Sequence, residues 1–298
     1  PGWVEHDGRE IWDSVLAAIA RARAAARARR TQVAAIGITN QRETVLLWDR
    51  HTGRPVARAI VWQDRRTAER CAALKRRGLE REVRRRTGLV LDPYFSATKL
   101  EWLFRNLAGL RVLARRGRLA FGTVDAWLLW KLTAGRVHAT DPTNASRTLL
   151  YDIGRHRWDE RLLELFGVPA SVLPRVLPSS GEFGRTHGVP GLPGGIPIAG
   201  MAGDQQAALF GQGCVSAGRS KNTYGTGCFM LLHTGSERVV SRAGLLTTIA
   251  CGPRGEPAYA LEGSVFVAGA ALQWLRDGLQ VIQRAGDSEA IARRVRDT

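Results

Sequence analysis

A single carboxylate, Asp204, lies where a strand is predicted to give way to a helix. The glycine-ended segment from Ile196 to Gly200 predicts a short strand, and Gln205 to Phe210 contains no helix breaker, which predicts a helix. Such junctions commonly carry functional residues in α/β folds. A carboxylate held there could act as a general base, although Asp is also a preferred helix N-cap residue. The residue by itself leaves both interpretations open.

A second polar group follows another predicted strand, Val33 to Thr39, at Arg42 and Glu43. The guanidinium donates hydrogen bonds and the carboxylate accepts them, so this pair could bind several hydroxyl groups of one small polyol. An exposed ion pair of little energetic value is the alternative. Trp62 and Tyr94 could supply an apolar wall and a phenol hydroxyl, or they could pack in the core.

The segment from Thr223 to Gly227 is a glycine-rich turn between two predicted strands. Its glycines would let backbone N–H groups approach a phosphate, and a threonine hydroxyl could add a further donor. An ordinary hairpin turn explains the same residues. The chain contains neither Gly-x-x-x-x-Gly-Lys nor Gly-x-Gly-x-x-Gly, so we expect neither a P-loop nor a Rossmann nucleotide site.

The composition is that of a globular protein. The 298 residues, 44% of them hydrophobic, predict about two domains. A net charge of +17 is compatible with a nucleic-acid partner, but the arginines are spread along predicted helices, which favours solvated helix faces.

Four scattered cysteines and six scattered histidines show neither metal-ligand spacing nor a disulfide pattern, so we expect a reducing cytoplasm and no protein metal site. No apolar run is long enough to cross a bilayer.

Predicted strands and helices alternate along the chain. Asp7 can cap an amphipathic helix from Arg9 to Arg30, and Ser96 to Asn106 and Val124 to Leu132 predict further helices. The composition changes after Gly211, which predicts domains at 1–210 and 211–298. In the second domain, strands are predicted at 220–224, 228–233, 245–250 and 258–262, followed by a helix over 265–279.

Several segments together resemble the glycerol kinases of the FGGY carbohydrate kinase family, in order and in spacing. They are Pro1 to Asp7, Gly37 to Thr44, Asp92 to Ser96, Asp141 to Thr148, Gly203 to Gln212 and Asn222 to Phe229, while Tyr94 to Leu103 resembles the signature of the wider family. The resemblance implies an α/β fold of the actin-like ATPase, ribonuclease-H-like type, in which two domains flank a central cleft. The first domain would bind the polyol, and the nucleotide would lie across both.

The resemblance also implies roles for individual residues. Asp204 would be the general base that takes a proton from glycerol as it attacks the γ-phosphate of ATP, with Mg²⁺ as a cofactor. The other residues implied to bind the substrate are Arg42, Glu43, Tyr94 and Gln205 on the hydroxyl groups, with Trp62 and Phe229 along the carbon chain. The residues implied to lie near the nucleotide are Thr226, Gly269 and Gln273.

The resemblance implies glycerol as the small-molecule partner and a homo-oligomer, dimer or tetramer, with no nucleic-acid partner and no membrane insertion. The chain begins after the family's first phosphate loop and stops within the second domain, so we expect a fragment that by itself turns over little or no substrate. Two alternatives stay open: an FGGY kinase acting on xylulose, ribulose or gluconate, and a non-enzymatic basic binding module. The aromatic residues would form a narrow slot, which favours glycerol over a longer sugar.

Overall fold

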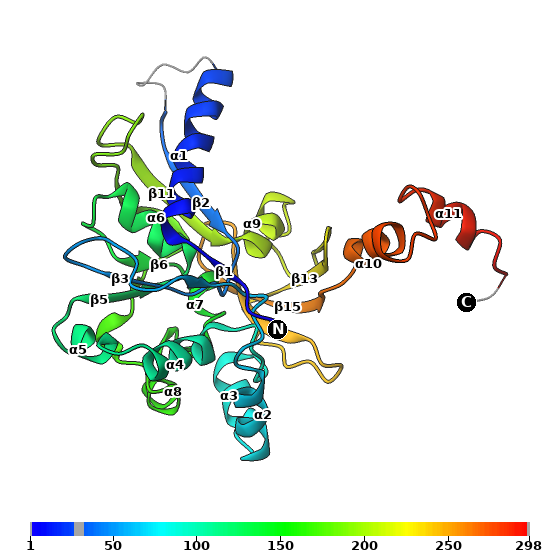
Figure 1. Ribbon diagram of the computed structural model, residues 1–298, viewed down its shortest axis with the longest axis horizontal. Helices are drawn as coiled ribbons and strands as arrows, with labels where there is room; N and C mark the ends of the chain where they lie inside the picture. Colours follow the sequence, from blue (N-terminus) through cyan, green and yellow to red (C-terminus); the bar gives the residue numbers. More distant parts are fainter. Residues whose placement is uncertain (1, 27–32, 297–298) are drawn as a thin grey trace.

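The computed structural model describes residues 2–26 and 33–296 and shows a mixture of helices and small sheets (Figure 1). A three-stranded sheet has the order β10-β11-β2. Its strands are β2 (Ile36–Asn40), β10 (Ser180–Arg185) and β11 (Pro197–Gly203). Strands β2 and β11 are parallel, and Asn40 pairs with Gly203 at their carboxyl ends. The residues that follow these two strands therefore leave the sheet at the same edge.

Helices and short strands surround this sheet within the first two hundred residues. The helices are α1 (Gly8–Ala25), α2 (Ala68–Arg76), α3 (Glu80–Thr87), α4 (Ser96–Asn106), α5 (Leu110–Arg115), α6 (Val124–Leu132), α7 (Pro142–Ala145), α8 (Glu160–Phe166) and the 3₁₀ helix η2 (Ala170–Val172). The strands are β1 (Glu5–His6), β3 (Leu46–Asp49), β4 (Ala59–Ile60), β5 (Leu119–Gly122), β6 (Ala139–Thr140), β7 (Tyr151–Asp152), β8 (Arg157–Trp158) and β9 (Arg175–Val176).

A second sheet follows helix α9 (Asp204–Gly211) and has the antiparallel order β12-β13-β15-β14. Its strands are β12 (Ser220–Tyr224), β13 (Cys228–Gly235), β14 (Leu246–Cys251) and β15 (Pro257–Val265). The chain then continues through α10 (Gly269–Gln273), the π-helix η3 (Trp274–Gly278) and α11 (Asp287–Ala292). These last helices extend away from the rest of the molecule (Figure 1).

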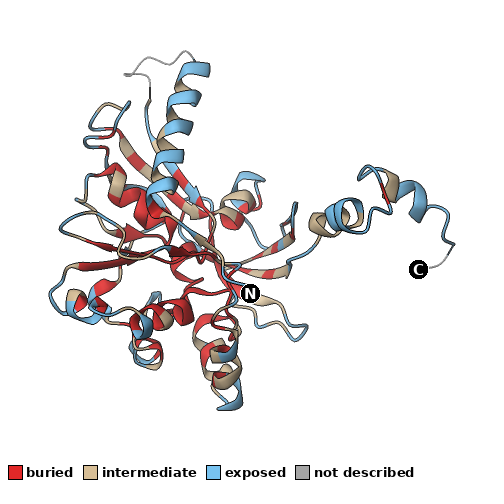
Figure 2. Cartoon of the chain, in the orientation of Figure 1, coloured by how far each residue is buried: buried red, intermediate tan, exposed pale blue. Residues whose placement is uncertain are grey.

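The buried residues gather where the sheets and the surrounding helices meet, shown in red in Figure 2. One apolar cluster lies around α4 and α8, and another around α6 and the three-stranded sheet. Helix α1 packs its Ile11, Trp12 and Val15 side against the second cluster, and its outer side is exposed. Both clusters include strand residues, so their packing holds the strands in place.

Within the described ranges, no helix combines the length and the apolar character needed to cross a membrane.

Several predicted elements are confirmed with the same bounds, namely α4, α6 and β12. Asp7 caps α1, since its side chain accepts a hydrogen bond from the amide of Arg9 at 2.8 Å. That helix ends at Ala25, and the predicted continuation to Arg30 falls partly on residues 27–30, outside the described residues.

The predicted helix over 265–279 is wrong in two respects. Strand β15 continues as far as Val265, which pairs with Cys228, so the helix begins only at Gly269. The β-branched and aromatic residues from Val265 to Val267 favour extended backbone over helix. After Gln273 the helix widens into the π-helix η3.

Candidate active site

Asp204 and Arg42 face one another at the common edge of β2 and β11. Asp204 is the first residue of α9, and Arg42 Nε lies 3.5 Å from its Oδ1. The helix cap is Gly203, so the N-cap interpretation of Asp204 is wrong. A side chain at 203 would clash, since its Cβ would lie 2.7 Å from Cγ and Cδ of Arg42. The Asp204 side chain is 45% exposed, which leaves its carboxylate accessible to a ligand.

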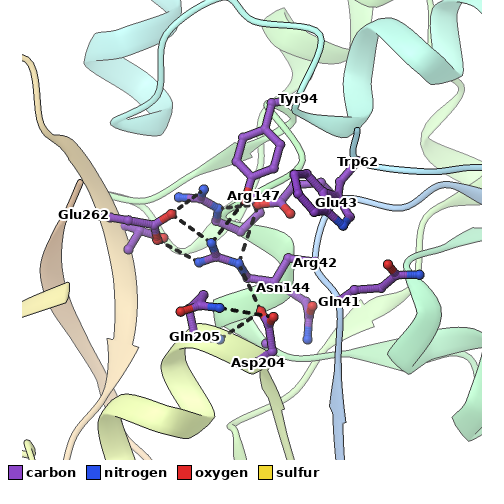
Figure 3. Close-up of polar contacts among 12 residues, drawn as sticks. Gln41, Arg42, Glu43, Trp62, Tyr94, Asn144, Arg147, Asp204, Gln205 and Glu262 are labelled. Atoms are coloured by element: carbon purple, nitrogen blue, oxygen red, sulfur yellow. Dashed lines mark hydrogen bonds and ion pairs between the residues drawn. The ribbon is translucent and has the colours of Figure 1, made fainter. Parts of the chain in front are cut away.

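Helix α7 supports the edge of the sheet where β2 and β11 end. Asp141 caps the helix by accepting hydrogen bonds from the amides of Thr143 and Asn144, at 3.0 and 3.1 Å. The Thr143 hydroxyl in turn accepts from the amide of Gly203 at 2.9 Å. Arg147 lies two residues after the end of this helix, so the same segment that supports Gly203 also delivers a guanidinium to the site (Figure 3).

Arg42 and Glu43 are 2% and 1% exposed, so the exposed ion pair is excluded as an interpretation. The Glu262 carboxylate accepts two hydrogen bonds from Arg42, at 2.7 and 2.8 Å, and one from Arg147 at 2.9 Å (Figure 3). Arg147 also donates from Nε to Glu43 at 2.7 Å. Two guanidinium groups and two carboxylates thus form one buried network, in which every charge has a partner.

Burial raises the pKa of both glutamates and ion pairing lowers it, but the stronger of the two effects differs between them. Burial raises the pKa of Glu43, and Arg42 and Arg147 offset that rise only in part. Burial also opposes ionisation of Glu262, but the pull of Arg147 and Arg42 outweighs it and lowers the pKa of Glu262 to about 2. Glu262 is therefore the firmly ionised member that holds both guanidinium groups.

The backbone of Glu43 has a φ of 62°, in the left-handed region that few non-glycine residues adopt. The hydroxyl of Ser96, at the start of α4, donates to the Glu43 carbonyl at 2.9 Å. The next amide, Thr44, donates to the Arg42 carbonyl at 2.7 Å. This tight turn allows adjacent residues to direct both of their side chains into the network.

Aromatic side chains form one wall beside the charged network. The Trp62 ring centroid lies 5.6 Å from that of Tyr94 and 6.4 Å from that of Phe229. Phe266 joins them, 5.3 Å from Tyr94. Trp62, Tyr94 and Phe266 line a cavity of about 280 Å³. Arg42 Nη2 donates to the Tyr94 hydroxyl at 3.3 Å, which links the wall to the charged network. These aromatic residues therefore border open space as well as packing against each other.

Gln205 and Lys221 lie on the other side of Asp204. The Gln205 amide nitrogen donates to Asp204 Oδ2 at 3.2 Å, and its amide oxygen contacts the ammonium of Lys221. That ammonium also donates to the Thr223 hydroxyl at 2.8 Å and to the Phe229 carbonyl at 3.2 Å. Burial lowers the pKa of Lys221 to about 8.

The glycine-rich turn forms the β12–β13 hairpin and packs against the start of α10. The amide of Gly269 donates to the Gly225 carbonyl at 2.9 Å, and that of Ala268 donates to the Thr226 carbonyl at 2.8 Å. Any Cβ at 269 would lie 2.5 Å from the Gly225 oxygen, so the close approach requires glycine. Gln273 is exposed at the end of α10, and within the described part of the chain no polar contact joins it to the other predicted site residues.

Comparison with known proteins shows the family to which the chain belongs. Residues 1–211 match the model of the N-terminal domain of the FGGY family of carbohydrate kinases, and residues 220–296 match that of its C-terminal domain. The chain belongs to this family. Its fold is accordingly the two-domain α/β fold of the FGGY kinases and actin-like ATPases.

Similar proteins include the glycerol kinase of Halorhodospira halophila, which is 59% identical over an alignment of 299 residues that covers 100% of this chain and 59% of that protein. Glycerol kinase 2 of Pseudomonas aeruginosa is also 59% identical, over 298 residues and 59% of its length. The crystal structure of Plasmodium falciparum glycerol kinase with ADP is 37% identical, with a TM-score of 0.90, and the match covers 100% of this chain and 60% of that one. The chain thus spans 59% of the length of the curated relatives it matches.

A xylulose kinase from Rhodospirillum rubrum shares the fold at 23% identity and a TM-score of 0.83, covering 99% of this chain and 59% of that one.

Several residues of this FGGY chain contact the predicted site although no role was assigned to them from the sequence. Among them are Arg147, Lys221, Glu262 and Phe266. Glu262 carried one signal, since it is a charged residue in an otherwise apolar strand, and such a residue is buried only when it is paired.

Proposed function

We propose that the full-length protein catalyses the ATP-dependent phosphorylation of glycerol to sn-glycerol 3-phosphate. The observation that carries the proposal is the meeting of the accessible Asp204 carboxylate with the Arg42–Glu43 pair beside an aromatic wall. The identity to glycerol kinases over the whole of this chain supports the same substrate.

Asp204 is the proposed general base. Glu43 and Glu262 lie in the same region, but both are buried and bonded to guanidinium groups, so neither is free to accept a proton from a ligand. Asp204 would accept the proton of a terminal hydroxyl as that oxygen attacks the γ-phosphorus of ATP and ADP leaves. No covalent intermediate on the protein is needed, because positioning and charge neutralisation supply the catalysis.

Arg42, Glu43, Tyr94 and Gln205 are proposed to bind the glycerol hydroxyls, with Trp62 and Phe229 along the carbon chain. The Arg42 side chain is fixed by Glu262, and its Nε faces Asp204, so it can present a donor at a defined position. The aromatic rings would exclude water from the carbon side of the ligand.

The ATP phosphates would be held at the glycine-rich turn. Thr226 is exposed, and neither its amide nor its hydroxyl is bonded to a described residue, so both can donate to a phosphate oxygen. Gly269 fits close contact with the same turn, and Gln273 is proposed to lie along the nucleotide. Bound Mg²⁺ would neutralise phosphate charge. Among residues 2–26 and 33–296 there is no cluster of three metal-ligating side chains, so we propose that phosphate oxygens and water together supply most of its ligands.

We also propose a domain boundary, a cellular location and an oligomeric state. We place the domain boundary near Gly211, where α9 ends, with the polyol domain at 1–210 and the nucleotide domain beginning at 211. We place the enzyme in the cytoplasm, because its described cysteines are free thiols. We propose a homo-oligomer on the family resemblance alone, which light scattering of the purified full-length protein would check.

The test is ATP consumption by the full-length protein with Mg²⁺ and a panel of glycerol, dihydroxyacetone, xylulose, ribulose and gluconate. Turnover selective for glycerol is expected. A preference for a pentulose or gluconate would keep the family and the base but overturn the substrate. Absence of turnover with every member of the panel, together with tight duplex DNA binding at physiological salt, would favour a basic binding module instead.

A further inference from the structure

A buried carboxylate, Asp141, supports the edge of the three-stranded sheet from which Asp204 and Arg42 emerge. Asp141 is 0% exposed, and five hydrogen bonds are donated to its two oxygens. No arginine or lysine within the described ranges forms an ion pair with it. A buried carboxylate without a counter-charge depends on its hydrogen bonds for stabilisation. The donors around Asp141 therefore show which parts of the fold this carboxylate holds in place.

These donors come from two segments of the chain. Thr143 donates from its amide at 3.0 Å and from its hydroxyl at 2.7 Å. Asn144 donates from its backbone amide at 3.1 Å and from its side-chain amide at 2.9 Å. The fifth donor is the hydroxyl of Ser179, directly before strand β10, at 2.7 Å. Capping α7 requires only the backbone donors, so the three side-chain donors serve another purpose.

The Thr143 hydroxyl connects Asp141 to the residue that precedes Asp204. The amide of Gly203 can only donate, so the Thr143 oxygen accepts from it at 2.9 Å. The hydrogen of the same hydroxyl is then directed to Asp141 Oδ2. Gly203 is the N-cap of α9 and Asp204 is the first residue of that helix. The hydroxyl of Thr143 therefore sets the point at which Asp204 enters the helix.

The Asn144 side chain connects the same carboxylate to the end of strand β2. Its amide oxygen accepts from Asn40 Nδ2 at 3.0 Å, and Asn40 is the last residue of β2, two positions before Arg42. Asp141 is thus linked through one side chain to the strand end that leads to Asp204, and through another to the strand end that leads to Arg42. These links fix the two strand ends relative to each other.

We propose that Thr143, held by Asp141, is a positioning residue that places the Asp204 carboxylate for proton transfer. The inference rests on the proposed function, in which Asp204 is the general base. A general base must lie within hydrogen-bond reach of the proton that it accepts, and a displacement of about 1 Å can slow a reaction about 10²-fold. Thr143 is 0% exposed, so it acts on the reaction through Gly203 and does not contact the substrate.

The test is steady-state kinetics of the full-length protein with glycerol and ATP. Thr143→Val keeps the shape of the side chain but leaves the Gly203 amide without its acceptor and Asp141 without one donor. The kcat should fall about tenfold or more, and the KM for glycerol should rise by a smaller factor. Thr143→Ser keeps the hydroxyl and should retain most of the wild-type kcat. Thr143→Cys should be slower than Thr143→Ser, because a thiol is a weak donor and a weak acceptor. The comparison of these two variants tests the proposal even if Thr143→Val does not fold.

Ser179→Ala is the matched control. It removes a hydroxyl that donates to the same Asp141 oxygen at the same 2.7 Å, but in the described structure that hydroxyl has no hydrogen bond to Gly203. Thermal melts should show a loss of stability in both Ser179→Ala and Thr143→Val, whereas only Thr143→Val should lose kcat.

Three results would overturn the proposal while leaving the proposed function intact. They are a wild-type kcat in Thr143→Val, an equal loss of kcat in Ser179→Ala, and a Thr143→Ser variant that is no faster than Thr143→Cys. Absence of turnover in the wild-type protein would instead overturn the proposed function, and this inference with it.

Discussion

The carboxylate of Glu262 accepts hydrogen bonds from both terminal nitrogens of Arg42, although the two residues are 220 positions apart in the chain. Arg42 lies in the segment that matches the N-terminal FGGY domain, and Glu262 lies in the segment that matches the C-terminal one. A residue proposed to bind the polyol is therefore held in place by a strand of the other domain. Any movement between the domains would alter the position of Arg42.

Glu262→Gln should raise the KM for glycerol more than it lowers kcat. The substitution keeps the side-chain size but leaves the Arg42 and Arg147 guanidinium groups with Glu43 as their main carboxylate partner. Breaking a buried ion network commonly costs about 3–5 kcal/mol, so the free energy of unfolding should fall markedly. Urea unfolding and steady-state kinetics of the full-length protein measure both effects.

Glu237→Gln is the control for this prediction, since Glu237 is exposed and its carboxylate forms no ion pair with a described residue. It should behave like the wild type, and Glu262→Asp should recover part of the lost glycerol affinity. If Glu262→Gln lowered stability but left KM unchanged, Glu262 would be structural and would not position Arg42 for the substrate.

Asp204→Asn should abolish most turnover while glycerol still binds. The amide keeps the size and one acceptor oxygen of the carboxylate, but it cannot take a proton at neutral pH. A loss of about 10²–10⁴-fold in kcat is expected. Calorimetric titration with glycerol should give an affinity close to that of the wild type. Asp13→Asn on the exposed side of α1 is the matched control. Wild-type kcat in Asp204→Asn would remove Asp204 from the role of base.

The meeting of β2 and β11 could be predicted in part from the sequence, because both strands end in polar residues and parallel strands share one carboxyl edge. Asp204, Arg42 and Glu43 indeed lie together there. Trp62 and Tyr94 were each compatible with core packing, and no local pattern states that their rings meet. Their contact depends on tertiary packing between segments that are not adjacent in sequence.

The network around Arg42 could not be predicted, because it depends on register within the second sheet. Glu262 faces Arg42 only because β15 pairs with β13 in the register that places Leu231 opposite Glu262. A shift of one residue would turn its carboxylate to the other face. Arg147 was equally hidden, since an arginine after a short helix is usually solvated and the sequence holds many arginines.

Turnover should fall as the pH rises through about 8, because burial lowers the pKa of Lys221 to that value. The ammonium that contacts Gln205 beside Asp204 is then lost, and at pH 9 about a tenth of it remains. Lys221→Gln should be slower at pH 7 and should not show this decline. Measuring kcat from about pH 6.5 to about pH 9.5 in both proteins tests this expectation.

Unfolding does not explain such a decline. A pKa that is lower in the folded protein means that the unfolded chain binds more protons between pH 8 and the ordinary lysine value of about 10.5, so this group makes the fold more stable as the pH rises. A thermal melt at pH 9 should therefore show no loss of stability from Lys221. A decline in turnover that persisted in Lys221→Gln would have to arise from another group.

Phe266→Ala should widen the slot proposed to select glycerol. The Phe266 ring centroid lies 5.3 Å from that of Tyr94 and 6.4 Å from that of Trp62, and all three residues line the same cavity. Because the ring is already 45% exposed, its removal should weaken glycerol binding by only about 1 kcal/mol, roughly fivefold in KM. Turnover of xylulose relative to glycerol should rise. Phe210→Ala, which removes a ring that is 44% exposed on α9, should leave this ratio unchanged. An unchanged ratio in Phe266→Ala would show that the hydroxyl-binding residues select the substrate and that the width of the aromatic slot does not.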